Sequence, residues 1–209
     1  RSPEPGVGLS ATSPGILSGS PSNCTPELSV VIATYNRHEA LADLLTDLDA
    51  QDEIAPGAFE VIVVDDGSDP PVRSRIDALA LDYPLEVVAQ SNAGQAAARH
   101  AGIVMARGEV VILLDDDMRI SRRFLAAHRA AHLAGAELVQ GAIKAPDHSM
   151  PLFERWHAAQ LESLGRAISD GRVVHHGDHT ATGNLSIRRH RYFEIGGFDS
   201  SLERSEDRD

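Results

Sequence analysis

The chain has 209 residues and contains little cysteine, little lysine and no excess of positive charge. Its single cysteine, Cys24, can form neither an internal disulfide nor a Cys-x-x-Cys zinc pair. Lys and Arg total 19 against 31 Asp and Glu, so the formal net charge is −12. This charge argues against a nucleic-acid partner, which binds through a basic face, and against a polybasic membrane anchor.

Long apolar runs are missing as well. The longest, such as 110–114, have the length of a strand and fall far short of the roughly 20 residues that span a bilayer. No charged and then apolar leader follows Arg1. We therefore expect a soluble domain with no transmembrane segment in this chain. The expected location is cytoplasmic, with the cytoplasmic face of a membrane as the alternative for the intact protein.

The sequence pattern divides the chain into a tail and one domain. Residues 1–26 are rich in Ser, Pro and Gly without apolar periodicity, which predicts a flexible tail. In residues 27–209, short apolar runs alternate with segments of helical spacing, which predicts parallel strands buried on both faces. Strands are expected at 28–33, 59–64, 85–89, 109–114 and 137–143. The predicted fold class is α/β, with a Rossmann-like, mostly parallel sheet and helices on both faces.

Apolar residues at helical spacing predict the helices between these strands. They are expected over 41–48, 76–83, 96–105 and 124–132. The third is rich in small residues and can approach the sheet closely, and Ser121 is the predicted N-cap of the fourth.

Polar clusters follow three of the predicted strands. They read TYNR at 34–37, DDGS at 65–68 and DDD at 115–117. In an open α/β sheet the ligand binds beyond the carboxyl ends of the strands, so the clusters are expected to form one site. The chain has neither a G-x-G-x-x-G fingerprint nor a P-loop, so a nucleotide would be held by side chains and a metal ion. Turn and cap chemistry is the alternative explanation for the first two clusters.

The aspartate triplet is the most informative cluster. Along an extended segment, Asp115 and Asp117 would share one side and Asp116 would face the other. Two carboxylates a few ångströms apart repel by about 4 kcal/mol at an effective dielectric constant of about 20. A divalent cation that prefers oxygen ligands relieves this repulsion, typically with substrate phosphates as further ligands. A solvated acidic loop is the alternative.

Three further segments carry polar residues. Gly183 precedes a predicted edge strand at 185–188 and would let a ligand approach closely. The late acidic pair Glu206 and Asp207 offers a candidate general base, with an ordinary acidic terminus as the alternative. The histidine-rich run 175–179 is expected to be a substrate-facing or solvated loop, because its spacing matches no helical i, i+4 metal pair.

Taken in order, these motifs resemble the inverting family 2 glycosyltransferases with the GT-A fold. The resemblance rests on SVVIATYNR at 29–37, VVDDGS at 63–68, NAG at 92–94 and LDDD at 114–117. It continues with GN at 183–184, GGFD at 196–199 and ED at 206–207. Each motif alone is weak, whereas the ordered set is specific.

The resemblance implies a role for each matching residue. The nucleotide or donor sugar is expected to contact Thr34, Tyr35, Arg37, Asp66, Arg99 and Asp116. Asp115 and Asp117 are the implied D-x-D pair, which would hold Mn²⁺ or Mg²⁺. Asp207 is the implied general base. The acceptor or donor-sugar side is expected to include Gly183, Asn184 and Glu206.

The implied function is inverting transfer of a sugar from a nucleotide sugar, above all a UDP-sugar, to a hydroxyl of a glycan, lipid-linked or small-molecule acceptor. Ala33 departs from the family pattern, which commonly has a hydroxyl residue there, and the chain ends two residues after Asp207, which predicts a truncated member. One alternative is a nucleotide-sugar-binding fragment without catalysis. The other is a receiver-type phosphoacceptor domain, which would need its acidic pair after the first strand.

Overall fold

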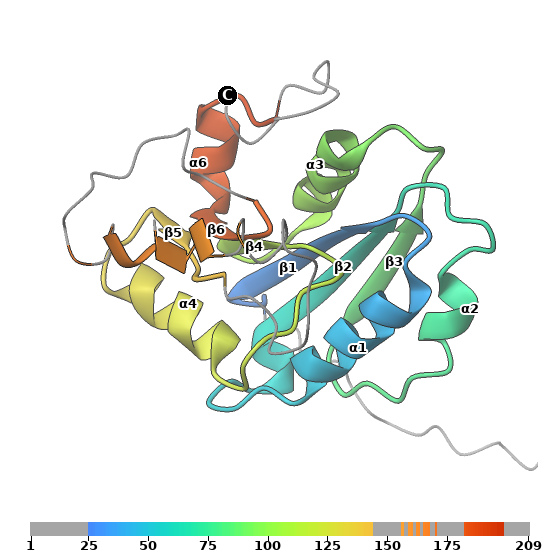
Figure 1. The fold of residues 1–209 in the computed structure, drawn as a ribbon, viewed down its shortest axis with the longest axis horizontal. Coiled ribbons are helices and arrows are strands. Elements are labelled where there is room, and N and C mark those ends of the chain that lie inside the picture. The colour runs from blue at the N-terminus through green and yellow to red at the C-terminus, as the bar shows by residue number, and fades with distance from the viewer. Residues whose placement is uncertain are drawn as a thin grey trace, which may run out of the picture.

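The computed structural model describes residues 25–143 and 182–198, together with scattered positions between 156 and 170. Its centre is a six-stranded sheet in the order β3-β2-β1-β4-β6-β5 (Figure 1). The strands are β1 (Leu28–Thr34), β2 (Phe59–Asp65), β3 (Leu85–Ala89), β4 (Val110–Leu114), β5 (Leu138–Gln140) and β6 (Asn184–Arg188). The strands β1, β2, β3 and β4 are parallel to one another, whereas β6 is antiparallel to both of its neighbours, β4 and β5. The predicted α/β class with a mostly parallel sheet is confirmed.

Helices cover both faces of this sheet, as predicted. On one face lie α1 (His38–Asp49) and α4 (Phe124–Leu133), and on the other α3 (Gln95–Met105) and α6 (Arg189–Glu194) (Figure 1). Two short elements, η1 (Pro56–Ala58) and α2 (Arg73–Ile76), flank β2 in the sequence. Among the residues that the structure describes, no helix combines the length and hydropathy of a membrane span.

The buried strand β1 determines where its neighbours end. It pairs with β2 from Leu28–Phe59 through Thr34–Asp65, so the two strands end side by side. On the face of the sheet that also carries α6, α3 packs closely against β1 at Gly102. A Cβ atom on Gly102 would lie 2.5 Å from Cγ1 of Val31. The expected close contact of this small-residue helix is confirmed. The loops that follow β1 and β2 are therefore attached to a tightly packed part of the sheet.

The two outer strands differ from the prediction. β3 is only half-buried, and β5 spans three residues and runs antiparallel to its neighbour. Both lie at an edge of the sheet, where a strand has one neighbour and an incomplete cover. β3 is therefore parallel as predicted but not buried on both faces, whereas for β5 both the direction and the burial were predicted wrongly.

Two predicted helix boundaries are also wrong. The helix expected over 76–83 ends at Ile76, and Tyr83 reaches the core from a loop, where its hydroxyl donates to a backbone carbonyl of α1. Ser121 is not an N-cap, because α4 begins at Phe124. The N–H of Leu125 instead donates to Oε1 of Gln51 at 3.0 Å, so a distant side chain caps this helix.

Candidate nucleotide-sugar site

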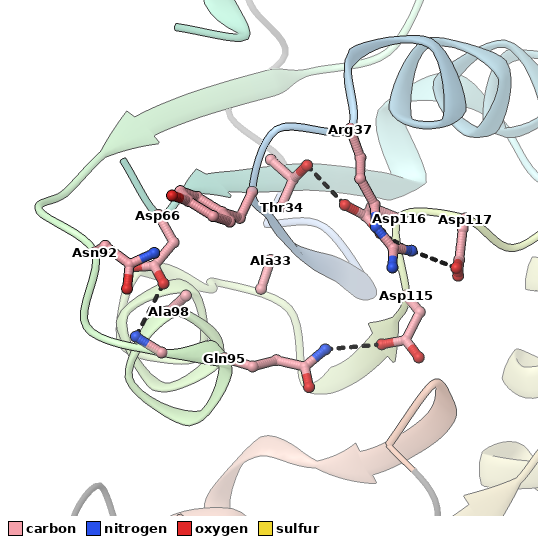
Figure 2. Close-up of a pocket in the computed structure, with 12 residues that line it drawn as sticks. Ala33, Thr34, Arg37, Asp66, Asn92, Gln95, Ala98, Asp115, Asp116 and Asp117 are labelled. Atoms are coloured by element: carbon pink, nitrogen blue, oxygen red, sulfur yellow. Dashed lines mark hydrogen bonds and ion pairs between the residues drawn. The ribbon is translucent and has the colours of Figure 1, made fainter. Parts of the chain in front are cut away.

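An open pocket of about 400 Å³ lies at the carboxyl edge of the parallel strands (Figure 2). That volume is in the usual range for small-molecule sites. The predicted residues that line it are Thr34, Tyr35, Arg37, Asp66, Asp115, Asp116 and Asp117. They are joined by Ala33, Asn92, Gly94, Gln95 and Ala98. The predicted convergence of three polar clusters on one site is thus confirmed.

The cluster after β1 is shaped by a turn at Asn36. This residue has a φ of 56°, which asparagine tolerates better than most residues. Its N–H donates to Oγ of Ser68 at 2.8 Å, so the loops after β1 and β2 are tied together. Tyr35 is half-exposed and lines the pocket. Arg37 is directed toward the aspartate triplet (Figure 2).

The two aspartates at the end of β2, Asp65 and Asp66, have different roles. Asp65 accepts the N–H groups of Ser68 and Val72, so its carboxylate closes the turn. Asp66 lines the pocket and accepts the N–H groups of Ala93 and Gly94, both at 2.9 Å. The turn interpretation therefore holds for Asp65, while Asp66 both faces the pocket and anchors the loop between β3 and α3.

The aspartate triplet does not alternate as predicted. The chain turns immediately after β4, and the N–H of Met118 donates to the carbonyl of Asp115. As a result Asp116 and Asp117 both contact Nη1 of Arg37, whereas Asp115 points toward α3 (Figure 2). Alternation of side chains requires an extended backbone, and the segment is extended only as far as Leu114.

Positive charge compensates the triplet on two sides. Arg99 of α3 is buried beside the pocket, not among the residues that line it, and its Nη2 donates to Oδ1 of Asp115 at 2.7 Å. The Thr34 hydroxyl donates to Oδ2 of Asp116 at 2.7 Å. Burial raises the pKa of Asp116, although the Thr34 bond and the Arg37 guanidinium oppose this shift. Asp116 in turn is the main cause of the raised pKa of Arg37.

The start of β6 lies against the triplet. The carbonyl of Gly183 accepts the N–H of Asp115 at 3.1 Å. A Cβ atom on Gly183 would lie 2.5 Å from Oδ2 of Asp115, so only glycine fits without a shift of that carboxylate. The Asn184 side chain is buried and contacts His128 of α4, and it does not line the pocket.

Several predicted residues lie outside the described part of the chain. These are Glu206 and Asp207, the histidine-rich run 175–179, and residues 1–24 of the predicted tail. Conversely, sequence reasoning gave no role to Asn92, Gly94 and Gln95. The NAG motif was the available signal: Gly94 has a φ of +90°, and the N–H groups of Ala93 and Gly94 both reach Asp66.

The fold matches that of solved glycosyltransferase structures of the GT-A class. S. aureus TarS in complex with UDP matches with a TM-score of 0.66 and 20% identity, covering 87% of this chain and 53% of that chain. The mannosyltransferase PcManGT from Pyrobaculum calidifontis, in complex with GDP-Man and Mn²⁺, matches with a TM-score of 0.64 and 22% identity, covering 93% and 53%. At these identities the likeness concerns the fold.

The Glycosyl transferase family 2 model matches residues 29–196, and the chain belongs to that family. An uncharacterized glycosyltransferase of Bacillus subtilis, YfnE, is 35% identical over 140 residues, which are 65% of this chain and 35% of that protein. An undecaprenyl-phosphate 4-deoxy-4-formamido-L-arabinose transferase of Pseudomonas fluorescens is 32% identical over 151 residues, 68% of this chain and 44% of that protein. The chain thus spans less than half the length of either relative. Family membership removes the receiver-domain alternative.

Proposed function

We propose that this chain binds a nucleoside diphosphate sugar, a UDP-sugar first of all, in the edge pocket and transfers the sugar with inversion to an acceptor hydroxyl. The observation that carries the proposal is the convergence of three strand-end clusters on one pocket beside two arginines. Among the similar structures, TarS was solved with UDP and with UDP-GlcNAc, and PcManGT with GDP-Man and Mn²⁺.

The pocket wall offers complementary groups for each part of such a donor. The half-exposed ring of Tyr35 can stack on a base. Asp66 accepts from Gln90, Ala93 and Gly94, and one acceptor position on Oδ2 remains for a ribose hydroxyl or a base N–H group. Asp116, which is buried between Thr34 and Arg37, would accept a hydrogen bond from a ribose or sugar hydroxyl. Arg37, with half of its side chain exposed, would supply a positive charge for the diphosphate.

The donor set of the triplet suits a hard divalent cation, either Mn²⁺ or Mg²⁺. Asp115 and Asp117 offer carboxylate oxygens for such an ion. Other ligands would have to complete the site, because no group of three or more His, Cys, Asp or Glu side chains in the described residues is arranged to hold a metal. Two carboxylates with substrate phosphates as the remaining ligands are typical for such ions. When bound, the cation would stabilise the charge of the departing nucleoside diphosphate. Arg37 would have to release Asp117, and Arg99 would keep Asp115 in place.

Inversion requires one displacement at the anomeric carbon. The acceptor oxygen forms the new bond on the face opposite the diphosphate, the bond to the diphosphate breaks, and a carboxylate takes the hydroxyl proton. We propose Asp207 as that base and Glu206 as its neighbour on the acceptor side, on the strength of the family motif. A glycan, a lipid-linked molecule or a small molecule with a free hydroxyl would serve as acceptor.

The test is a panel of UDP- and GDP-sugars incubated with the chain and Mn²⁺, with release of the nucleoside diphosphate as the readout. We expect one donor to be hydrolysed slowly, with water in place of the acceptor. With methanol as a surrogate acceptor, NMR of the methyl glycoside should show the anomeric configuration opposite to that of the donor. Binding without any release would favour the fragment that binds a donor and does not catalyse, and absence of binding to every donor would contradict the proposal.

A further inference from the structure

A buried polar cluster lies between α4 and β6, away from the pocket lining. Its members are His128, His132, Asn184 and Ser186, which are at most 5% exposed. Both ring nitrogens of each histidine contact a polar atom. Such contacts are expected, because burying a polar group without a hydrogen bond costs free energy. The proposed donor site gives these side chains no role.

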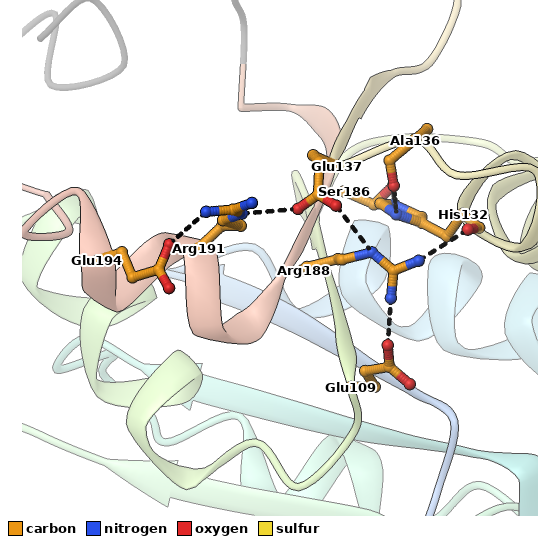
Figure 3. Close-up of polar contacts among 8 residues, drawn as sticks. All are labelled: Glu109, His132, Ala136, Glu137, Ser186, Arg188, Arg191 and Glu194. Atoms are coloured by element: carbon orange, nitrogen blue, oxygen red, sulfur yellow. Dashed lines mark hydrogen bonds and ion pairs between the residues drawn. The ribbon is translucent and has the colours of Figure 1, made fainter.

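The side chains form one continuous chain of contacts. Nε2 of His128 lies 3.0 Å from Oδ1 of Asn184, and Nδ1 lies 2.7 Å from Oγ of Ser186. Ser186 also contacts Nε2 of His132 at 2.8 Å, and Nδ1 of His132 reaches the Ala136 carbonyl (Figure 3). Polar contacts therefore run without a break from β6 to the end of α4.

The Asn184 amide determines which nitrogen of His128 carries the proton. Nδ2 of Asn184 donates to the Ala142 carbonyl, so Oδ1 is the atom that faces His128 and can only accept. Burial lowers the pKa of His128, which keeps the ring neutral with a single proton. Since Oδ1 of Asn184 only accepts, that proton is on Nε2, and Nδ1 of His128 is an acceptor that faces Oγ of Ser186. Nε2 of His132 faces the same hydroxyl, whose single proton can be donated to only one of the two rings.

Asn184 connects this cluster with the aspartate triplet. It is the first residue of β6 and pairs with Leu114, the last residue of β4. Its neighbour Gly183 accepts the Asp115 N–H and lies against the Asp115 carboxylate. The adjacent residues Gly183 and Asn184 therefore link the His128 ring to the backbone and the carboxylate of Asp115.

We propose that His128 is a positioning residue for the edge pocket: its Nε2–H holds Asn184, and Asn184 keeps Gly183 against Asp115. The consequence for donor binding rests on the proposed function, whereas the geometric link does not. The two ring nitrogens have separate tasks. Nε2 sets the position of the β6 start, while Nδ1 joins the ring to Ser186 and secures the packing of α4.

A matched pair of variants separates these tasks in the 209-residue chain. The amide nitrogen of glutamine can reach the place of Nε2, so His128→Gln keeps the bond to Asn184 and loses the bond to Ser186. The shorter amide of asparagine reaches only the place of Nδ1, so His128→Asn does the reverse. The readout is hydrogen exchange of the Asp115 amide, which reports its bond to the Gly183 carbonyl without any ligand.

We expect His128→Asn to lower the protection of the Asp115 amide at least about fivefold, the effect of roughly one hydrogen bond, relative to the amides of β1. His128→Gln should leave it within about twofold of the original protein, although each variant loses one ring contact. Equal changes in both variants would overturn the proposal, because they would indicate a packing role alone. No change in either variant would overturn it as well.

The unaltered protein provides a second test should a variant not fold. Nitrogen-15 NMR of the imidazole at pH 7 should show His128 with its proton on Nε2, and a proton on Nδ1 would contradict the proposed bond to Asn184. UDP affinity in the presence of Mn²⁺ should follow the Asp115 protection across the two variants. If the original protein binds neither UDP nor GDP, the proposed function fails while the exchange result still decides the positioning role.

Discussion

Replacing Gly183 with alanine places a methyl group against the carboxylate that is proposed to hold the metal ion. The new Cβ atom would lie 2.5 Å from Oδ2 and 3.2 Å from Cγ of Asp115. Contacts this short do not persist, so the Asp115 side chain must rotate. Rotation breaks its bond to Arg99, which at 2.7 Å is the main contact holding Asp115 in its present orientation.

The magnitude follows from that contact. A hydrogen bond to a charged group contributes about 1.5–3 kcal/mol, and Arg99 is buried, so most of this value should be lost from the free energy of unfolding. For a chain of this size, that loss lowers the melting temperature by roughly 2–4 °C per kcal/mol. With Asp115 turned away, Mn²⁺-dependent affinity for UDP should fall at least about tenfold.

Thermal melting and calorimetric titration of UDP measure the two effects. Gly57→Ala is the matched control, because nothing lies within 4 Å of a Cβ atom there, and it should change neither quantity. A Gly183→Ala protein that binds UDP and Mn²⁺ like the original would refute the proposed role of Asp115.

Three further predictions concern other parts of the structure. Asp66→Ala should weaken UDP binding at least about tenfold and lower the melting temperature, because it removes an acceptor from the N–H groups of Ala93 and Gly94; unchanged binding with a lower melting temperature would make Asp66 purely structural. Burial lowers the pKa of His128 and His132 below the ordinary value of 6.5, so the unfolded chain binds more protons and stability should be lost as the pH falls below about 6.5; urea unfolding between pH 5 and 8 should show a smaller loss for His128→Gln. In a longer protein that contains this chain, Asp207→Asn should keep donor binding yet slow transfer by about 10²–10⁴-fold, and near-normal transfer would assign the base elsewhere.

The sequence predicts the sheet and the location of the site well, because both depend on local patterns. Apolar runs identify β1, β2 and β4, and these buried strands bring the clusters containing Thr34, Asp66 and Asp115 to one edge. Position along the chain was sufficient here, since parallel strands in such a sheet present their carboxyl ends together.

The structural features that were predicted wrongly or missed depend on contacts between residues that are distant in the sequence. The N-terminus of α4 is capped by Gln51, which lies 74 positions before its partner Leu125. The aspartates of the triplet are paired with Arg37 and Arg99, which come from another loop and another helix. No local pattern carries such information, and the same reason explains why the contact between His128 and Asn184 could not be anticipated.

The central claim is that Asp115 and Asp117 bind a divalent cation together with a nucleoside diphosphate in the edge pocket. Calorimetric titration of UDP into the 209-residue chain, once with Mn²⁺ and once with a chelator, tests it most directly. We predict clear binding with Mn²⁺ that weakens at least about tenfold with the chelator, a difference of about 1.4 kcal/mol. Equal affinity under the two conditions would contradict the metal role of these aspartates.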